Sequence, residues 1–154
     1  MIQRIQTIWL LISAISSGFL IKGGIVNFID KTWQKYFTGF SGIYKLTESG
    51  QEIVTSSVPL AVLIILIPLL SLISILFFKS RRIQKVLTLI LVTLSLCLII
   101  LVTYYSYILM KSYDTELVFG IKMVVPLIIL IAVILAYRGI SSDDSLVKSY
   151  DRLR

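Results

Sequence analysis

Four long runs of apolar residues dominate the sequence, and polar residues are concentrated between them and after the last one. The runs cover residues 5–21, 58–78, 83–110 and 117–137. Each has at least the roughly 17 residues that an α-helix needs to cross about 30 Å of hydrocarbon. Helix is expected because a lipid-embedded backbone must satisfy its hydrogen bonds within the segment. The pattern therefore predicts an all-α fold, a transmembrane four-helix bundle that forms a single integral membrane domain over residues 1–154.

The composition agrees with a membrane protein. Hydrophobic residues make up 57% and charged residues 15% of the chain, against about 45–50% and about 25% in soluble domains. A soluble fold of this size cannot bury so much apolar surface. The first run has the basic flank and small residues of a secretory signal, but no small-x-small cleavage site follows it. We therefore expect residues 5–21 to be retained as a span.

The distribution of Lys and Arg predicts how the bundle is oriented. With four spans both termini lie on the same side, and every arginine of the sequence falls on that side. The short loop between the second and third runs, Lys79 to Lys85, carries the densest group of basic residues. Because Lys and Arg are enriched in cytoplasmic loops, both termini are expected in the cytoplasm, the arrangement called N-in/C-in.

Residues 22–57 then form a short extracytoplasmic loop. Residues 42–46 and 51–55 flank a turn that contains Gly50, a pattern typical of a β-hairpin. Residues 27–37 are expected to form a short amphipathic helix. The aromatic side chains of the loop either anchor it among the lipid headgroups or offer a face to a partner. These candidate contacts are Trp33, Tyr36, Phe37, Phe40 and Tyr44.

Residues 138–154 form a cytoplasmic tail with the signature of a helix start. Ser142 is a suitable N-cap, and Asp143 and Asp144 favour the positive end of a helix. Leu146, Tyr150 and Leu153 recur at helical spacing. We expect a short C-terminal amphipathic helix on the cytoplasmic face, with a frayed, solvated end as the alternative.

Reactive side chains are scarce. The sequence has no histidine and a single cysteine, Cys97, which excludes His-based acid–base catalysis, histidine-ligated metals and an intrachain disulfide. No catalytic residue, cofactor or metal ligand is predicted. The net charge of +7 is explained by membrane orientation, since the basic residues flank apolar runs, and no nucleic-acid partner is expected.

Some polar and small residues remain as candidates for lipid contact or helix packing. Arg81, Arg82 and Lys85 are placed to meet anionic lipid headgroups. Lys122, inside the fourth run, either extends to the interface or binds a headgroup or a partner carboxylate. Pro68 and Pro126 are expected to kink their spans, leaving either a packed bend or a cleft.

Two small-residue patterns in the first run predict close contact between helices. They are Ser13-x-x-x-Ser17 and Ala14-x-x-x-Gly18. The small side chains let two helix backbones approach, and the hydroxyls of Ser13 and Ser17 can bond across the seam or back to a carbonyl. We expect this run to pack closely against at least one other span.

The two ends of the chain together resemble a known family. The segments that carry the resemblance are Met1 to Leu11, Leu135 to Ile140, and the tail residues Asp144, Leu146, Val147 and Asp151 to Arg154. They are similar to the ends of an uncharacterised family of four-span inner-membrane proteins of Bacteroidota, a domain of unknown function. The resemblance implies a bacterial inner (cytoplasmic) membrane and supplies no activity, ligand or catalytic residue.

The resembling ends suggest a cytoplasmic docking surface for a larger membrane complex. Its candidate residues are Gln3, Arg4, Gln6, Arg138, Asp151, Arg152 and Arg154. The leading hypothesis is thus a non-enzymatic accessory or structural subunit of a bacterial inner-membrane protein complex, in contact with the lipid bilayer. The alternative is a binder or carrier of lipid or a small hydrophobic molecule, with Pro68, Pro126 and Lys122 around a cleft. A lipid-modifying enzyme is the third and weakest hypothesis.

Overall fold

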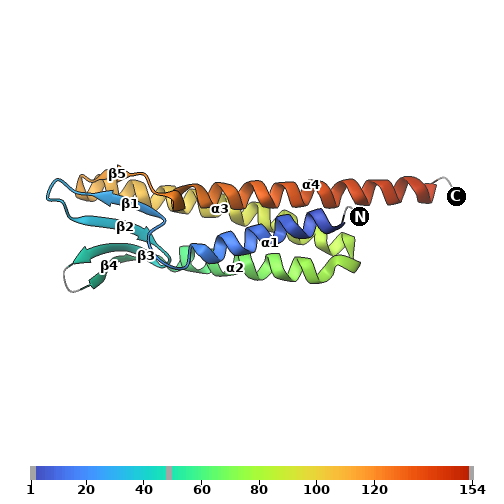
Figure 1. Ribbon diagram of the computed structural model, residues 1–154, viewed down its shortest axis with the longest axis horizontal. Helices are drawn as coiled ribbons and strands as arrows, with labels where there is room; N and C mark the ends of the chain where they lie inside the picture. The colour runs from blue at the N-terminus through green and yellow to red at the C-terminus, as the bar shows by residue number, and fades with distance from the viewer. Residues whose placement is uncertain (1–2, 48–49, 153–154) are drawn as a thin grey trace.

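The computed structural model describes the backbone of residues 3–47 and 50–152, and the side chains of residues 5–47, 50–78 and 80–143. Figure 1 shows an elongated bundle of helices with a β-sheet at one end, while α1 begins and α4 ends at the opposite end. The helices are α1 (Gln3–Phe19), α2 (Val58–Leu76), α3 (Arg81–Tyr113) and α4 (Val125–Arg152), with 3-10 turns η1 (Phe77–Lys79) and η2 (Ile121–Val124). The strands are β1 (Val26–Ile29), β2 (Lys35–Gly39), β3 (Gly42–Thr47), β4 (Gly50–Ser56) and β5 (Glu116–Val118).

The prediction of an all-α fold is wrong, because the described residues form an antiparallel sheet of five strands beside the four helices. The fold is therefore α+β. The predicted hairpin is present as β3 and β4, which pair from Gly42 with Ser56 to Thr47 with Gly50. An isolated two-stranded hairpin is marginally stable in water. Here it is extended by three further strands that the sequence analysis did not predict.

The expected amphipathic helix over residues 27–37 is replaced by β1, a turn and β2. Alternate residues of these strands share a face, because Val26 pairs with Thr38 and Phe28 pairs with Tyr36. All four of these side chains are buried. The period of two thus determines the local structure, and the aromatic residues that looked like one face of a helix are divided between the two faces of a sheet.

The last strand comes from a distant part of the chain. β5 pairs with the free side of β1, placing Leu117 opposite Phe28, and gives the strand order β4-β3-β2-β1-β5. Leu117 and Val118 were expected to begin the fourth span, but they lie in this strand. The helix begins only at Val125, with Pro126 in its first turn, where a missing N–H costs no hydrogen bond. Pro126 therefore marks the start of a helix rather than a kink within one.

The sheet rests on the last turns of α3. The inner face carries Phe28, Tyr36 and Ile43, each at most 5% exposed. Tyr36 stacks on Tyr113 of α3 with ring centroids 5.1 Å apart. A helix of 33 residues is roughly 50 Å long, much longer than about 30 Å of hydrocarbon. The last turns of α3 are thus the platform on which the sheet packs.

Hydroxyl groups connect α1 to α2 within the apolar bundle. Ser13 Oγ and Ser71 Oγ are 2.8 Å apart, and Ser17 Oγ donates to the carbonyl oxygen of Ile64 at 2.9 Å. Both α1 serines are fully buried. Ser13-x-x-x-Ser17 is thus a helix seam as predicted. Gly18 is exposed, and a Cβ built on it would meet nothing within 4 Å. In the second pattern, Ala14-x-x-x-Gly18, the glycine is therefore not in close contact with another helix.

Three helical segments of the described chain are long and apolar enough to cross a membrane: Val58–Leu76, Arg81–Tyr113 and Ile121–Asp143. The apolar part of α1, Ile5–Phe19, is shorter. The tail does not form a separate helix starting at Ser142, since α4 continues unbroken through this position to Arg152. Its sequence there contains no proline or glycine that would end the helix.

Candidate functional site

The end of the bundle opposite the sheet contains a partly buried polar contact between the first and the last helix. Gln6 Nε2 donates to Asp143 Oδ2 at 2.6 Å. Arg81 of α3 donates from Nη1 to the backbone oxygen of Asp143 at 3.3 Å. Gly139 gives Gln6 its space, because a Cβ at that position would lie 2.9 Å from Gln6 Cγ. Asp143 thus receives hydrogen bonds from two other helices.

This contact changes the interpretation of the predicted cytoplasmic docking residues. Gln6 is 4% exposed and bonded inside the bundle, so its side chain is a packing element. Arg138 is exposed on α4. The side chains of Gln3, Arg4, Asp151 and Arg152, and the whole of Arg154, lie outside the described residues. Whether the ends of the chain form one surface therefore stays a prediction.

The candidate lipid-contacting residues fall into two groups. Arg82 is exposed, and Arg81 and Lys85 are half-buried, all at the start of α3. Lys122 lies at the other end of the bundle, in η2, next to the start of the candidate span Ile121–Asp143. Its Nζ donates to the backbone oxygen of Lys22 and lies 4.7 Å from the ring centre of Phe19. Lys122 therefore joins η2 to the end of α1.

Most of the aromatic residues predicted to contact lipid headgroups or a partner pack inside the sheet end. Tyr36 lies under the sheet against Tyr113. Phe37 and Tyr44 stack on the opposite face, 5.1 Å apart and nearly parallel. Phe40 is half-buried against the core. Of the five predicted side chains only Trp33 is free to contact a partner, with 84% of its surface exposed.

Trp33 occupies a strained position in the turn between β1 and β2. Its φ is +62°, in the left-handed region that residues other than glycine rarely adopt. The turn is closed by two backbone hydrogen bonds, from Trp33 N to Asp30 O at 2.8 Å and from Asp30 N to Gln34 O at 3.0 Å. The Asp30 carboxylate also accepts from Lys31 N at 2.6 Å and from Thr32 Oγ1 at 3.0 Å. A rigid turn thus presents an exposed indole.

An ion pair attaches this turn to the end of α3. Lys31 Nζ contacts Asp114 Oδ2, and both side chains are mostly exposed. The hydrogen bond to Asp114, followed by its charge, raises the pKa of Lys31 above the ordinary value. Asp114 is the C-cap of α3 and also has a positive φ, +47°. Trp33 and Asp114 are the two described non-glycine residues with positive φ. One lies in the turn and the other at the end of α3, and the Lys31–Asp114 pair joins these two segments.

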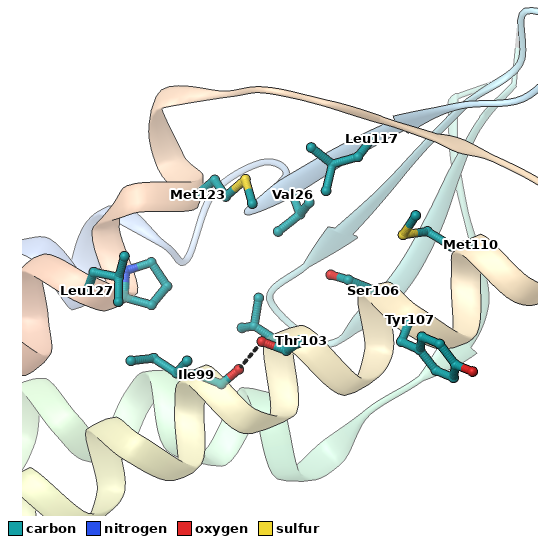
Figure 2. A pocket seen from close by; sticks show the side chains of 11 residues that line it. Val26, Ile99, Thr103, Ser106, Tyr107, Met110, Leu117, Met123 and Leu127 are labelled. Carbon is teal, nitrogen blue, oxygen red and sulfur yellow. Dashed lines mark hydrogen bonds between the residues drawn. The ribbon is translucent and has the colours of Figure 1, made fainter.

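A cavity of about 340 Å³ lies where the sheet joins the bundle. Figure 2 shows α3 along one side of this space and Met123, Val26 and Leu117 on the other. Its remaining lining residues belong to α3 and to the first turn of α4, and apolar side chains dominate. They are Ile99, Val102, Thr103, Ser106, Tyr107, Met110, Pro126 and Leu127.

The polar side chains of the cavity differ in whether their hydroxyl groups have a hydrogen-bond partner. Thr103 Oγ1 donates to the carbonyl oxygen of Ile99 at 2.8 Å. The ring of Tyr107 turns away from the space (Figure 2) and is largely exposed. Ser106 is 9% exposed, and its hydroxyl has no hydrogen-bond partner among the described residues. Among residues whose side chains are described, no group of three His, Cys, Asp or Glu is placed to hold a metal ion.

Comparison with protein families places the chain in one of them. Residues 2–153 match the family described as Domain of unknown function (DUF4293). The chain belongs to this family. The match covers almost the whole of the chain, both of its ends included, as the resemblance of those ends had predicted. No curated protein and no protein of solved structure shows significant similarity to the chain.

Sequence reasoning identified Trp33 among several aromatic residues but missed the Gln6–Asp143 contact. It also proposed a cleft around Pro68, Pro126 and Lys122, and of these three residues Pro126 alone lines the cavity. The local signal for the cavity was Pro126, which starts α4 and lies in the cavity wall. Gln6 and Asp143 are 137 positions apart, and no local pattern connects them. Their pairing is decided by the packing of α1 on α4.

Proposed function

We propose that this member of the family is a non-enzymatic accessory subunit of a bacterial inner-membrane protein complex. In this proposal all four helices cross the membrane, both termini lie in the cytoplasm, and the sheet lies outside it. The bacterial inner membrane is implied by the resemblance of the chain's ends to proteins of Bacteroidota. The arrangement in Figure 1 supports the topology, because α1 begins and α4 ends at the end of the bundle opposite the sheet.

The observation that carries the proposal is the position of Trp33. Arg81 and Arg82 begin α3, and such residues favour the cytoplasmic surface. Roughly 20 Å of this helix must then extend past the hydrocarbon, most of it at the sheet end. The turn that contains Trp33 is joined to the last residue of this extension through Lys31 and Asp114. Headgroups extend only about 5–8 Å beyond the hydrocarbon, so the indole lies above them.

This depth favours partner binding over membrane anchoring for Trp33. An interfacial tryptophan lies at headgroup level, whereas this one is carried beyond it on a rigid turn. An exposed tryptophan in water contributes no stability to the free protein. In protein interfaces, however, tryptophan is among the residues that most often contribute a large share of the binding energy. A turn of fixed geometry also loses little entropy when it binds. We therefore expect a protein partner to bury Trp33.

The experiment compares proteins recovered with a tagged wild-type chain and with its Trp33→Gly variant in mild detergent. Glycine adopts positive φ without strain, so the variant loses the indole while the turn keeps its stability, within about 1 kcal/mol. We expect a stoichiometric partner of the wild type to be reduced at least tenfold. A photoreactive amino acid at position 33 is expected to crosslink to the same protein in intact cells.

Phe119→Ala is the matched control, since Phe119 is equally exposed, 86% against 84%. It lies between β5 and η2, nearer to the bundle. We expect this variant to retain the partner. Equal recovery with wild type and Trp33→Gly, or crosslinks from position 33 to lipid alone, would be incompatible with a partner bound at the turn.

The cytoplasmic docking surface is a second contact in the same proposal. Arg4→Ala combined with Arg152→Ala tests it in the same purification. Loss of the partner in this double variant but not in Trp33→Gly would transfer the contact from the sheet end to the cytoplasmic end. Loss in neither variant would leave both surfaces without a partner.

A further inference from the structure

One side chain of α3 departs from the behaviour of its neighbours. Thr88, Thr93, Ser95 and Thr103 each donate a hydroxyl hydrogen bond to a backbone oxygen of the preceding turn, at 2.8 to 3.3 Å. This is how hydroxyl residues are normally satisfied inside apolar helices. Ser106 follows Thr103 by one turn and is buried, but it makes no such bond. Its hydroxyl is directed instead into the cavity (Figure 2).

An unpartnered buried hydroxyl is costly. Leaving such a group without a hydrogen bond costs about 1–3 kcal/mol, although Ser106 could turn to bond the preceding turn of its own helix. Six described side chains have buried hydroxyls without a partner, and Ser106 is the one that lines the cavity. The Ser106 oxygen is covered by neighbouring atoms, so a hydrogen-bonding group within the cavity would satisfy it after a small rotation of the serine side chain.

The size and lining of the cavity indicate which kind of molecule fits it. Its volume of about 340 Å³ lies in the range of small-molecule sites, about 300–1,000 Å³. The lining is almost entirely apolar, and among its residues Ser106 has the one buried hydroxyl without a hydrogen-bond partner in the described part of the chain. Such a site accepts an apolar chain with one hydrogen-bonding atom. It offers no charged side chain from its lining residues to a headgroup.

The position along α3 identifies this chain as that of a membrane lipid. Ser106 lies 25 residues after Arg81, which is roughly 38 Å along the helix. With Arg81 at the cytoplasmic surface, Ser106 reaches the boundary between the outer hydrocarbon and the headgroups. The ester carbonyls of bilayer lipids lie at this depth, while Ile99 and Leu127 lie deeper, among the acyl chains.

We propose that the cavity binds one acyl chain of a diacyl phospholipid, with the Ser106 hydroxyl donating to the lipid's ester carbonyl. The inference rests on the membrane placement of the proposed function and is independent of the partner at Trp33. The bound lipid fills the junction between sheet and bundle and touches α3, α4, β1 and β5. It thereby stabilises the position of the sheet on the membrane domain.

The experiment uses two lipids that differ only at the carbonyl. The full-length protein is delipidated in detergent and incubated with diester phosphatidylethanolamine or with its diether analogue, and bound lipid is counted by native mass spectrometry. We expect one retained diester molecule per chain and about fivefold to tenfold lower occupancy for the diether, the effect of losing one hydrogen bond. Ser106→Ala is expected to bind both lipids equally, at the lower level.

Thr103→Val is the matched control, because it removes a hydroxyl of the same cavity that already has a backbone partner. It is expected to keep the preference for the diester. In the absence of lipid, Ser106→Ala should unfold at the same temperature as the wild type or higher, because it removes an unsatisfied hydroxyl. This separates loss of the site from loss of the fold.

Three results would overturn the proposal. Equal retention of diester and diether by the wild type would indicate ordinary lipid around the helices. Unchanged diester binding by Ser106→Ala would remove the serine from the site. Displacement of the diester by a stoichiometric amount of a quinone would assign the cavity to a different class of carbonyl compound. Cysteine labelling that placed the sheet in the cytoplasm would instead reject the membrane placement.

Discussion

Gln6 and Asp143 show how single polar residues organise an apolar bundle. Burying an amide or a carboxylate is unfavourable unless its hydrogen bonds are made, so these two side chains strongly favour the arrangement in which they meet. Their bond of 2.6 Å joins α1 to α4 across almost the full length of the chain. Apolar side chains pack in many ways with similar energy, whereas this pair specifies one register.

We predict that Gln6→Ala lowers the free energy of unfolding by about 1–3 kcal/mol, since it leaves the half-buried Asp143 carboxylate without its donor. Thermal unfolding in mild detergent, followed by circular dichroism, measures the change. Arg138→Ala, at an exposed position of α4, is the control and is expected to stay within about 0.5 kcal/mol. Equal unfolding midpoints for Gln6→Ala and wild type would show that the bond is not needed for packing.

Among the elements, β1 has the central role at the sheet end. It pairs with β2 on one side and with β5 on the other, and so connects the segment before α2 to the segment between α3 and α4. The turn after β1 is joined to the C-cap of α3 by Lys31 and Asp114. Both chain segments are thereby fastened to the same helix end, which fixes the direction in which Trp33 points.

The Lys31–Asp114 pair can be tested through its pKa. Because Asp114 raises the pKa of Lys31 in the folded state, the contribution of the pair to stability is present below the unfolded pKa of lysine, about 10.4. It is lost as pH rises through the higher folded value. We predict that Asp114→Asn returns the pKa of Lys31 towards normal, measured by NMR titration of its side-chain nitrogen.

Asparagine suits this test because it tolerates the positive φ of position 114, so the variant removes the charge and keeps the backbone. Glu116→Gln is the control, since Glu116 is the weakest of the charges that act on Lys31. It should change the titration much less. If both variants titrate like the wild type, Lys31 and Asp114 are not paired in solution.

At the scale of the whole molecule, the separation of the sheet from the ends of α1 and α4 leads to a topology prediction (Figure 1). Cys97 is the only cysteine of the sequence, so Cys97→Ser provides a cysteine-free background. Gln34→Cys at the sheet end and Ser142→Cys near the cytoplasmic end of the fourth span then act as single reporters at exposed positions. We predict that a membrane-impermeant maleimide labels Gln34→Cys in intact spheroplasts and labels Ser142→Cys only after lysis.

The control for this measurement is the natural Cys97, which is exposed in the middle of α3. In a membrane that position faces lipid, and the impermeant reagent should not reach it before or after lysis. Labelling of both reporters in intact spheroplasts would be inconsistent with three spans, α2, α3 and α4, between the two reporter positions. The proposed depths of Trp33 and Ser106 relative to the membrane would then be wrong as well.

The sequence by itself determined the elements that depend on local pattern. Apolar runs of spanning length predicted α2 and α3 and most of α1 and α4, because apolar length is what the bilayer selects. The turn at Gly50 predicted the pairing of β3 with β4, since neighbours in sequence can pair through a short connection. The seam through Ser13 and Ser17 followed from small residues one turn apart.

Only the tertiary structure decided which distant segments meet. Leu117 and Val118 begin an apolar run, and nothing local shows that they complete a sheet beside β1. Residues 27–37 carry aromatic residues compatible with either period, and the burial of Phe28 and Tyr36 under the sheet decides for strands. The cavity at Ser106 exists only because α3, α4, β1 and β5 converge there. Local pattern determines which faces must be buried, whereas the choice of partner depends on geometry between segments far apart in the chain.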